Sequence, residues 1–381
     1  MKTFRVATNV MQDLINKAKK GAGNIPQLPI TKTVEFDLTD GVLTLSTTDE
    51  VNHLKVYSPG VAGDNVKFIV LIDIISNLIL KITTEYIDFE VEDAHLKVKA
   101  DGDYVIELFV DDQEEEMAAF PQPHTMNEVG VEIETLASSE FNTSCVPILL
   151  GCKQFLAAQK SISSDATRYY VTNEAITSAG LECVCNVKYK GFPMTTLIPV
   201  ELAQLMQILP GNSTAFIQIW NMTDNGYKTC RCHVYCDGID IYGVLPNDEL
   251  DTYPLGLVEQ ILDNQYEYQC VLNKNQLLSA ISRISLFINP AGFRNVYFTF
   301  DNTGVILSVP GNNSSEKIKY FEGGPNKIGT NYQIVVPLNV LINSLNFIDE
   351  DNCLIRYGND SCICVQSGQT KLCIAILSDE E

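Results

Sequence analysis

Hydrophobic positions along the chain repeat one pattern, in which a short β-branched strand runs directly into a short apolar helix. The three copies of this pattern are residues 66–82, 194–209 and 331–347. Val70, Ile198 and Val336 occupy equivalent places at the ends of the strands, and a leucine or a proline follows each of them. Because the copies lie about one domain length apart, the pattern predicts three tandem copies of one domain.

Each copy is expected to be strand, helix and three strands, twice over, in an α+β domain. Alternation of apolar and polar residues predicts the strands, and Asp40-Gly41 and Asp101-Gly102 predict hairpin turns between them. Helical spacing predicts six helices, at 9–20, 72–82, 148–162, 200–209, 274–287 and 337–347. An acidic run followed by Pro121 and Pro123, and a second stretch at 246–254, read as linkers. The predicted domains are 1–124, 125–253 and 254–381.

Composition is that of a protein with large packed cores. The chain has 381 residues, of which 45% are hydrophobic. No apolar run reaches the ~18 residues of a membrane helix, and the N-terminus lacks the apolar core of a signal peptide. We therefore expect a soluble, cytoplasmic protein with no membrane partner.

Twelve cysteines lie between Cys145 and Cys373, and six of them form C-x-C pairs. Residues i and i+2 of a strand point to the same face, so these cysteines read as small apolar residues on buried strand faces. Zinc sites use C-x₂₋₄-C loops, often with histidine, and the four histidines do not cluster suitably. The sequence therefore predicts no metal and no cofactor, and a cytoplasmic setting disfavours disulfides.

Charge is distributed unevenly between the predicted helices and the rest of the chain. The chain carries a net charge of −22, which disfavours nucleic-acid binding when it is taken alone. The six predicted helices, however, hold only three acids, Asp13, Asp73 and Glu201. Their basic residues are Lys17, Lys19, Lys20, Lys81, Lys153, Lys160, Lys274 and Arg283. A basic helical surface on an acidic body suits sequence-independent contact with duplex phosphates, although lysines also commonly decorate exposed helices.

Several short motifs add a resemblance that covers essentially the whole chain. They are Leu28-Pro29-Ile30, Thr48-Asp49, Arg168-Tyr169-Tyr170 and Phe293-Arg294-Asn295-Val296. Together with the three-domain layout, their order and spacing resemble the bacterial DNA polymerase III β sliding clamp. The resemblance implies a head-to-tail homodimer, a ring with the helices on its inner face and the sheets outside. Such a ring encircles duplex DNA and tethers a replicative polymerase, so that it confers processivity without chemistry of its own.

The resemblance also implies which residues perform each role. The DNA-binding residues would be Lys17, Lys19, Lys20, Asn24, Lys81, Lys153, Lys160, Arg168, Tyr169, Tyr170, Lys274 and Arg283. The dimer interface would contain Tyr104, Ile106, Leu108, Leu286 and Phe287. A pocket for short linear peptides of the polymerase and the clamp loader would be lined by Val171, Leu181, Pro254, Ile374, Ile376 and Leu377.

The chain departs from the family pattern at three places. Asn24 stands where the family has an arginine that touches DNA, and a shortened Ala179-Gly180-Leu181 replaces a longer pocket segment. The C-terminus continues as Ser378-Asp379-Glu380-Glu381 where the family ends in an apolar–basic pair. These departures predict an altered pocket, which would suit a phage-encoded clamp that serves its own polymerase.

Two other classes of protein were weighed against the clamp. An enzyme is disfavoured because the chain has no P-loop, no G-x-S-x-G and no H-E-x-x-H motif. A β-rich structural or adhesin-like repeat protein of a virion would share the strands, the acidity and the repeats. It would require neither basic helices nor a closed dimer, so a closed dimer discriminates between the two readings. The third repeat disfavours the trimeric clamp of two-domain chains.

Overall fold

The computed structural model describes residues 1–23, 25–92, 94–110, 119–156, 167–288, 295–309, 311–330 and 332–377. The chain divides into two compact units. The first unit consists of Met1–Ser144 and Glu201–Pro246, and the second of Cys145–Val200 and Asn247–Glu381. Within the described part, no helix is long and apolar enough to cross a membrane. The acidic run at 111–116, Phe293-Arg294 and the tail at 378–381 lie outside the described residues.

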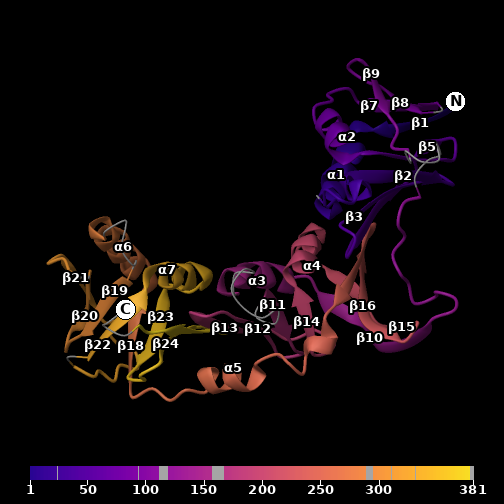
Figure 1. Cartoon of the computed structure of the whole chain (residues 1–381). Helices are drawn as coiled ribbons and strands as arrows, with labels where there is room; N and C mark the ends of the chain where they lie inside the picture. The colour runs from indigo at the N-terminus through magenta and orange to yellow at the C-terminus, as the bar shows by residue number, and fades with distance from the viewer. Residues whose placement is uncertain are drawn as a thin grey trace. The chain divides into compact units, whose positions relative to one another are not determined.

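The chain is built from six consecutive segments, each with a strand, a helix and three further strands (Figure 1). The first segment is β1 (Lys2–Ala7), α1 (Thr8–Ala18), β2 (Thr33–Thr39), β3 (Val42–Thr48) and β4 (His53–Pro59). A two-residue strand, β5 (Ala62–Gly63), leads to the second segment. That segment is β6 (Val66–Leu71), α2 (Ile72–Ile79), β7 (Tyr86–Glu92), β8 (His95–Lys99) and β9 (Asp103–Glu107).

The middle of the chain holds the third and fourth segments. The third is β10 (Glu132–Asn142), α3 (Cys145–Cys152), β11 (Arg168–Val171), β12 (Ala175–Ala179) and β13 (Cys183–Lys188). The fourth is β14 (Thr196–Pro199), α4 (Val200–Leu205), β15 (Thr214–Asp224), β16 (Tyr227–Cys236) and β17 (Ile239–Leu245).

An additional helix, α5 (Leu255–Leu262), separates the fourth segment from the fifth. The fifth is β18 (Tyr268–Asn273), α6 (Lys274–Ile284), β19 (Asn295–Phe300), β20 (Gly304–Ser308) and β21 (Ser315–Lys319). The sixth is β22 (Tyr332–Pro337), α7 (Leu338–Phe347), β23 (Asn352–Tyr357), β24 (Cys362–Ser367) and β25 (Thr370–Ala375).

Segments are linked in pairs by an exchange of their first strands. The strand β1 pairs with β7 of the second segment, and β6 pairs with β2 of the first. The same exchange places β10 beside β15, β14 beside β11, β18 beside β23 and β22 beside β19. Neither segment of a pair has a complete sheet without the other, because each receives the first strand of its partner.

Two further pairings merge sheets from neighbouring segment pairs. In the first unit, β17 pairs antiparallel with β4, which gives the eight-stranded sheet β10-β15-β16-β17-β4-β3-β2-β6. In the second unit, β13 pairs antiparallel with β25, which gives the sheet β14-β11-β12-β13-β25-β24-β23-β18. Both junctions join the last strand of one segment to the last strand of another. The remaining sheets are β5-β1-β7-β8-β9 and β21-β20-β19-β22.

Four phenylalanines fill the space between the two sheets at the N-terminal end of the chain. The rings of Phe4 and Phe89 stack with centroids 4.6 Å apart, and those of Phe36 and Phe68 stack at 4.8 Å. All four side chains are buried, and each stacked pair joins an exchanged first strand, β1 or β6, to the strand beside which it lies, β7 or β2. Offset aromatic pairs add stability beyond the apolar area that they bury. The exchange of strands is therefore locked by the packing of these rings.

Most of the expected elements are confirmed, and the differences have physical causes. Val70, Ile198 and Val336 are buried at the ends of β6, β14 and β22, directly before α2, α4 and α7. The helix expected at 148–162 instead begins at Cys145, because its uniformly apolar start has no periodicity to mark it. The strand expected at 129–135 extends to Asn142 through a register shift at 135–137. The helix α5 was not expected at all.

Replacing Phe89 by alanine should destabilise the first unit by about 3–5 kcal/mol, because it leaves a cavity beside the rings of Phe4 and Phe36. Tyr86→Ala, on the same strand but exposed, is the matched control and should cost less than about 1 kcal/mol. Trp220, the single tryptophan, is buried in the same unit and reports its unfolding by fluorescence during urea denaturation. Equal midpoints for the two variants would contradict the locking role of the rings.

His53 lies at the junction of β4 with β17, where its partner across the ladder is Tyr242. Burial lowers the pKa of His53 to about 4, and the cationic neighbours Lys55, His124 and Arg231 lower it further while Asp49 opposes them. Between about pH 4 and the unfolded value near 6.5, the unfolded chain binds a proton that the folded chain does not. The junction is therefore expected to lose stability as pH falls through this window.

The unfolding midpoint of the first unit should consequently fall between pH 7 and pH 4.5, and His53→Gln should flatten that dependence. His95→Gln, an exposed position on β8, is the matched control and should keep the slope of the unsubstituted protein. The measurement is urea denaturation followed by Trp220 fluorescence at several pH values. An unchanged slope in His53→Gln would remove His53 from the pH dependence of this junction.

Candidate functional site

Three of the basic residues expected on the helices are exposed and make no ion pair within the described part of the chain. Lys20 follows α1, Lys81 follows α2, and Lys153 follows α3. Each stands at the C-terminal end of its helix, where the macrodipole favours a positive charge. These lysines are the available cations beside the helices, Lys20 and Lys81 in the first unit and Lys153 in the second.

The other described basic residues of the helices are already engaged. Lys17 forms an ion pair of 2.6 Å with Asp13, and Lys19 lies 3.4 Å from Asp73. The ammonium group of Lys274 donates to the carbonyl of Ile348, directly after α7, at 2.8 Å. The Nε and Nη2 groups of Arg283 donate to the two carboxylate oxygens of Glu316 on β21. This contact lowers the pKa of the Glu316 carboxyl group. Asn24 and Lys160 lie outside the described residues.

The Arg168-Tyr169-Tyr170 motif does not lie with the helical lysines. Tyr169 is buried in the core, so it cannot reach a ligand in this conformation. Arg168 pairs with Glu249 at 3.1 Å, and the ring of Tyr170 stacks on Tyr253 at 4.9 Å. Strand alternation places Arg168 and Tyr170 on the sheet face opposite Tyr169. We therefore do not group this motif with Lys20, Lys81 and Lys153.

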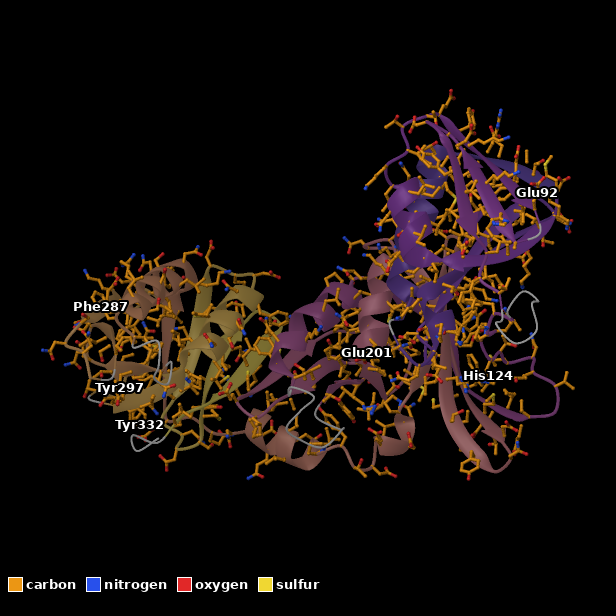
Figure 2. The ribbon with its side chains drawn as sticks, turned by 45° about the horizontal axis from the view of Figure 1, so that its top comes forward. Glu92, His124, Glu201, Phe287, Tyr297 and Tyr332 are labelled. Carbon is orange, nitrogen blue, oxygen red and sulfur yellow. The ribbon has the colours of Figure 1, made fainter. Side chains whose placement is uncertain are left out.

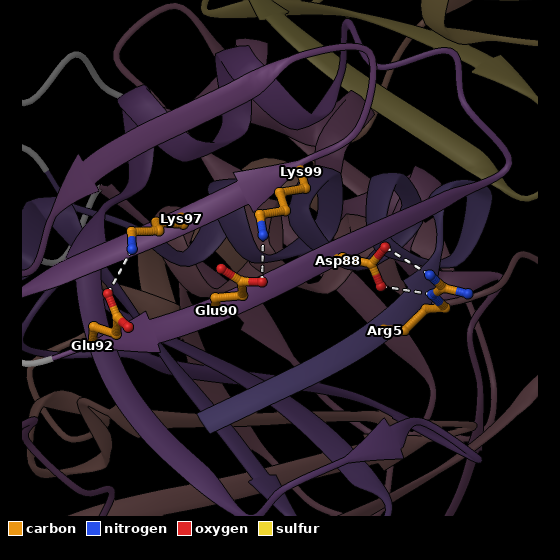
Figure 3. Close-up of polar contacts among 6 residues, drawn as sticks. All are labelled: Arg5, Asp88, Glu90, Glu92, Lys97 and Lys99. Carbon is orange, nitrogen blue, oxygen red and sulfur yellow. Dashed lines mark hydrogen bonds and ion pairs between the residues drawn. The ribbon is translucent and has the colours of Figure 1, made fainter. Parts of the chain in front are cut away.

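Basic residues on the sheet of the first unit are neutralised by acids, in contrast to those three lysines. Figure 3 shows three ion pairs on the polar face of β1, β7 and β8. They are Arg5–Asp88 at 2.6 Å, Lys99–Glu90 at 2.5 Å and Lys97–Glu92 at 2.6 Å. The opposite face of β7 carries buried Phe89. The positive charges of this sheet face are therefore compensated by neighbouring carboxylates.

Two sheets end in edge strands, β9 in the first unit and β21 in the second. On β9, Ile106 is buried within its own unit, as is Leu108 just beyond the strand, whereas Tyr104 is exposed and Val105 is 64% exposed. Near β21, Leu286 and Phe287 at the end of α6 are 80% and 51% exposed (Figure 2). An edge strand with exposed apolar residues is a template for pairing with another chain.

The β21 edge also borders an open groove. It has a volume of about 820 Å³ and lies between α6 and β21. Residues 316–322 form one wall, and Asn275, Ser279 and Arg283 stand on the other. The outward side chains of β21 include Lys317 and Lys319, whereas those of β9 include Asp103 and Glu107. The outward lysines of β21 therefore contrast with the outward acids of β9, although Lys317 also forms an ion pair with Asp301 of its own unit.

The eight-stranded sheet of the second unit has both of its faces covered near the β13–β25 junction. Cys183 and Cys185 point toward α3 and α7, since the thiol of Cys185 lies 3.8 Å from that of Cys152 and Cys183 lies beside Ser344 of α7. Val184 and Cys373 point to the other face, which α5 covers. Figure 1 shows α5 on the opposite side of this sheet from α3 and α7.

The residues expected to line a peptide pocket are divided between these faces. Val171 and Ile374 are buried on the side of α3 and α7, so they cannot line a pocket under α5. Pro254 precedes α5, and Leu181 is exposed in the turn between β12 and β13. Ile376 and Leu377 follow β25, where Leu377 bridges to Val335 of β22. The α5 face itself is lined by Tyr170, Val184 and Cys373.

All twelve cysteines are free and buried, and the burial of the six in C-x-C pairs confirms the prediction from their spacing. Burial raises the pKa of the Cys145, Cys232 and Cys353 thiols to about 12, so they remain protonated at neutral pH. Among the described residues, no group of three or more His, Cys, Asp or Glu side chains could hold a metal ion.

The six-segment architecture, with exchanged first strands and merged sheets, is the fold of the DNA sliding clamps. The chain matches the sliding clamp of Bacillus subtilis with a TM-score of 0.80 at 12% identity, over 99% of each chain. It matches a putative DNA polymerase III beta subunit from Eubacterium rectale with a TM-score of 0.79 at 12% identity, over the full length of both. The beta subunit from Thermotoga maritima matches with a TM-score of 0.77 at 14% identity, over 99% of this chain and 100% of that one. No family model and no curated protein sequence matches the chain.

Proposed function

We propose that the chain is a DNA sliding clamp, which encircles duplex DNA and tethers a replicative polymerase in the cytoplasm without catalysing a reaction. The observation that carries the proposal is the full-length match to bacterial clamps in all six segments. Each of the three proposed domains, 1–124, 125–253 and 254–381, would contain one pair of segments. No cofactor is required, because the proposed role involves no reaction. Enclosure of the duplex takes the place of tight binding to DNA.

The sheet junctions support a head-to-tail dimer. In each junction the last strand of a pair's first segment, β4 or β13, joins the last strand of a later pair's second segment, β17 or β25. By the same rule, β21 and β9 are the two last strands of segments that have no such junction within the chain. Pairing β21 with β9 of a second copy is a heterologous contact, which closes into a ring when its rotation returns to the start.

Charge and apolar contacts favour that pairing. Antiparallel strands place outward side chains on one face, so Lys317 and Lys319 would meet Asp103 and Glu107 across the interface. Leu286 and Phe287 would supply apolar contacts, as would Tyr104 and Val105 on β9. Ile106 and Leu108 would support β9 from beneath, since they are already buried in their own unit.

Exposed cations on the helices suit a duplex that is held without base readout. Lys20, Lys81 and Lys153 can approach phosphates directly or through water, which positions a duplex and reads no sequence. Lys17, Lys19, Lys274 and Arg283 contribute less because they are already paired. Polymerase and clamp loader would dock through short linear peptides on the sheet side, where α5 covers an apolar face.

The purified protein should have a mass of twice 42.3 kDa by light scattering, and Lys317→Glu with Lys319→Glu should shift it toward 42.3 kDa. Asp103→Lys with Glu107→Lys should do the same, because like charges would then face each other across the strands. All four substitutions in one chain restore opposite charges and should restore the dimer.

The matched control for the edge strands is Lys228→Glu, which breaks an exposed ion pair with Glu134 away from both edges. It should remain dimeric. Val105→Asp tests the apolar part of β9 independently and should give monomers. A dimer that survives Val105→Asp and both charge reversals would overturn the β9–β21 interface.

Replacing Lys20, Lys81 and Lys153 together by glutamate should weaken binding to a short duplex roughly tenfold at low salt and flatten its salt dependence. Fluorescence anisotropy across a salt series is the measurement, with dimer mass checked by light scattering. Lys97→Glu with Lys99→Glu, in the ion pairs of the sheet, is the matched control and should change binding little. Equal losses in both variants would place DNA elsewhere than on the helices.

A further inference from the structure

Aromatic rings form a row across three strands of the eight-stranded sheet in the first unit. The ring of Phe216 on β15 stacks on that of Tyr235 on β16, with centroids 5.3 Å apart. His233 lies beside Tyr235 at 4.9 Å and stacks on Tyr242 of β17 at 4.1 Å. Buried apolar residues alternate with these four positions, so this aromatic row lies on the sheet face that points away from the core.

Carboxylates lie beside the exposed rings of this face. Phe216 is 37% exposed, and its partner across the β10–β15 ladder is the exposed Glu140. On β4, beyond β16 and β17, Tyr57 is 39% exposed. Burial, Asp240 and Asp237 raise the pKa of the Tyr57 hydroxyl group, so both carboxylates lie near that ring. Within the described part of the chain, Glu140 and Asp237 form no ion pair.

The cations of the same face are balanced by other acids. Lys55 faces Asp240 across the β4–β17 ladder, and Asp240 raises the pKa of its ammonium group against the effect of burial. Arg231, farther along β16, is half-buried, and its neighbour Glu128 opposes the lowering of its pKa by burial. The two carboxylates beside the exposed rings are therefore left without a cation among the described residues.

The same unit shows what an exposed ring and a neighbouring carboxylate can hold. Tyr86 and Asp88 lie two residues apart on β7, so they share one face. The guanidinium group of Arg5 lies 5.8 Å from the centroid of the Tyr86 ring and donates to both carboxylate oxygens of Asp88, at 2.6 and 2.8 Å (Figure 3). A planar guanidinium group can stack on a ring and pair with two oxygens, whereas an ammonium group lacks this fork of donors.

We propose that this face binds an extended, arginine-containing segment of a protein partner. One guanidinium group stacks on Phe216 and pairs with Glu140, and a second does the same at Tyr57 and Asp237. Since β15 and β4 are three strand spacings apart, the two sites are separated by roughly 15 Å. An extended segment rises about 3.3 Å per residue, so arginines four or five residues apart reach both sites. This binding goes beyond the proposed clamp role and does not depend on it.

The first test compares peptides of equal charge. The probe is the fluorescein-labelled peptide Gly-Arg-Gly-Ser-Gly-Arg-Gly, with binding measured by fluorescence anisotropy at low salt. Its counterpart with two lysines accounts for general attraction to an acidic chain and should bind about threefold more weakly or less. A peptide of the same composition with adjacent arginines should also bind about threefold more weakly, because it reaches one site only. Equal affinities of the three peptides would overturn the proposal.

Substitutions on the face provide the second test. Phe216→Ala and Glu140→Gln should each weaken binding of the arginine probe about threefold, and so should Tyr57→Ala and Asp237→Asn at the other site. Glutamine and asparagine keep the size of the carboxylates, and asparagine tolerates the positive φ of Asp237, so these variants report even if an alanine variant unfolds. Unchanged binding in all four variants would overturn the proposal.

The matched control is Glu132→Gln, on the same strand as Glu140. Glu132 is exposed, but its partner across the ladder is Thr223 in place of an aromatic ring. This variant should bind the arginine probe as the unsubstituted protein does. A loss equal to that of Glu140→Gln would show that the probe responds to net charge alone, which would overturn the proposal.

A single-stranded oligothymidylate tests the other occupant that stacks on exposed rings. It should not bind to this face, because the free carboxylates repel its phosphates. If Phe216→Ala weakens binding of the oligonucleotide and leaves binding of the arginine probe unchanged, the face is a nucleic-acid platform and the proposal is wrong.

The four substitutions should leave the mass of the protein and its binding to duplex DNA unchanged. Loss of the dimer or of duplex binding in the unsubstituted protein would remove the proposed function and leave the arginine site intact. Failure of the peptide tests would remove the arginine site and leave the clamp untouched.

Discussion

The structure depends on one constraint, that a strand with free backbone groups must find a partner. Last strands of segments meet this constraint at β17–β4 and at β13–β25, and these two antiparallel ladders turn separate sheets into continuous ones. The exchange of first strands obeys the same constraint inside each segment pair. Among the last strands of the six segments, β9 and β21 are the two that pair with one neighbour only within the described structure, and the proposed assembly depends on them.

The sequence predicted helices and strands correctly where their hydrophobic periodicity is clear. It did not predict a helix whose stability depends on the surface against which it packs. The three strand–helix corners were found because Val70, Ile198 and Val336 end β-branched runs directly before a helical pattern. The helix α5 was missed because its eight residues lie beside a linker signal. The sheet face that stabilises it is assembled from strands distant in the chain, and no local pattern reports such a surface.

Some site residues were assigned wrongly for another reason: the sequence did not show to which face of the sheet each side chain of a strand points. On β13 and β25, apolar residues occupy both faces, so alternation carries no signal for which face each side chain takes. Val171 and Ile374 were accordingly expected at a pocket and lie in the core. Charge posed a related limit: sequence counts the lysines of the helices, but only the structure separates those held by acids or carbonyls from those left free.

The long separation of the paired last strands has a consequence for how the chain folds during synthesis. The strand β4 can pair with β17, and β13 with β25, only after the later strand has been synthesised. In each case the later strand lies nearly half the chain further on. Ladders between such distant segments close slowly, because the entropy of the intervening loop is lost before contacts compensate it. On the ribosome, β4 and β13 thus each remain open edges while nearly half of the chain is made. Proper assembly of this protein therefore depends on the order in which its edges emerge and are protected, as well as on the stability of the finished sheets.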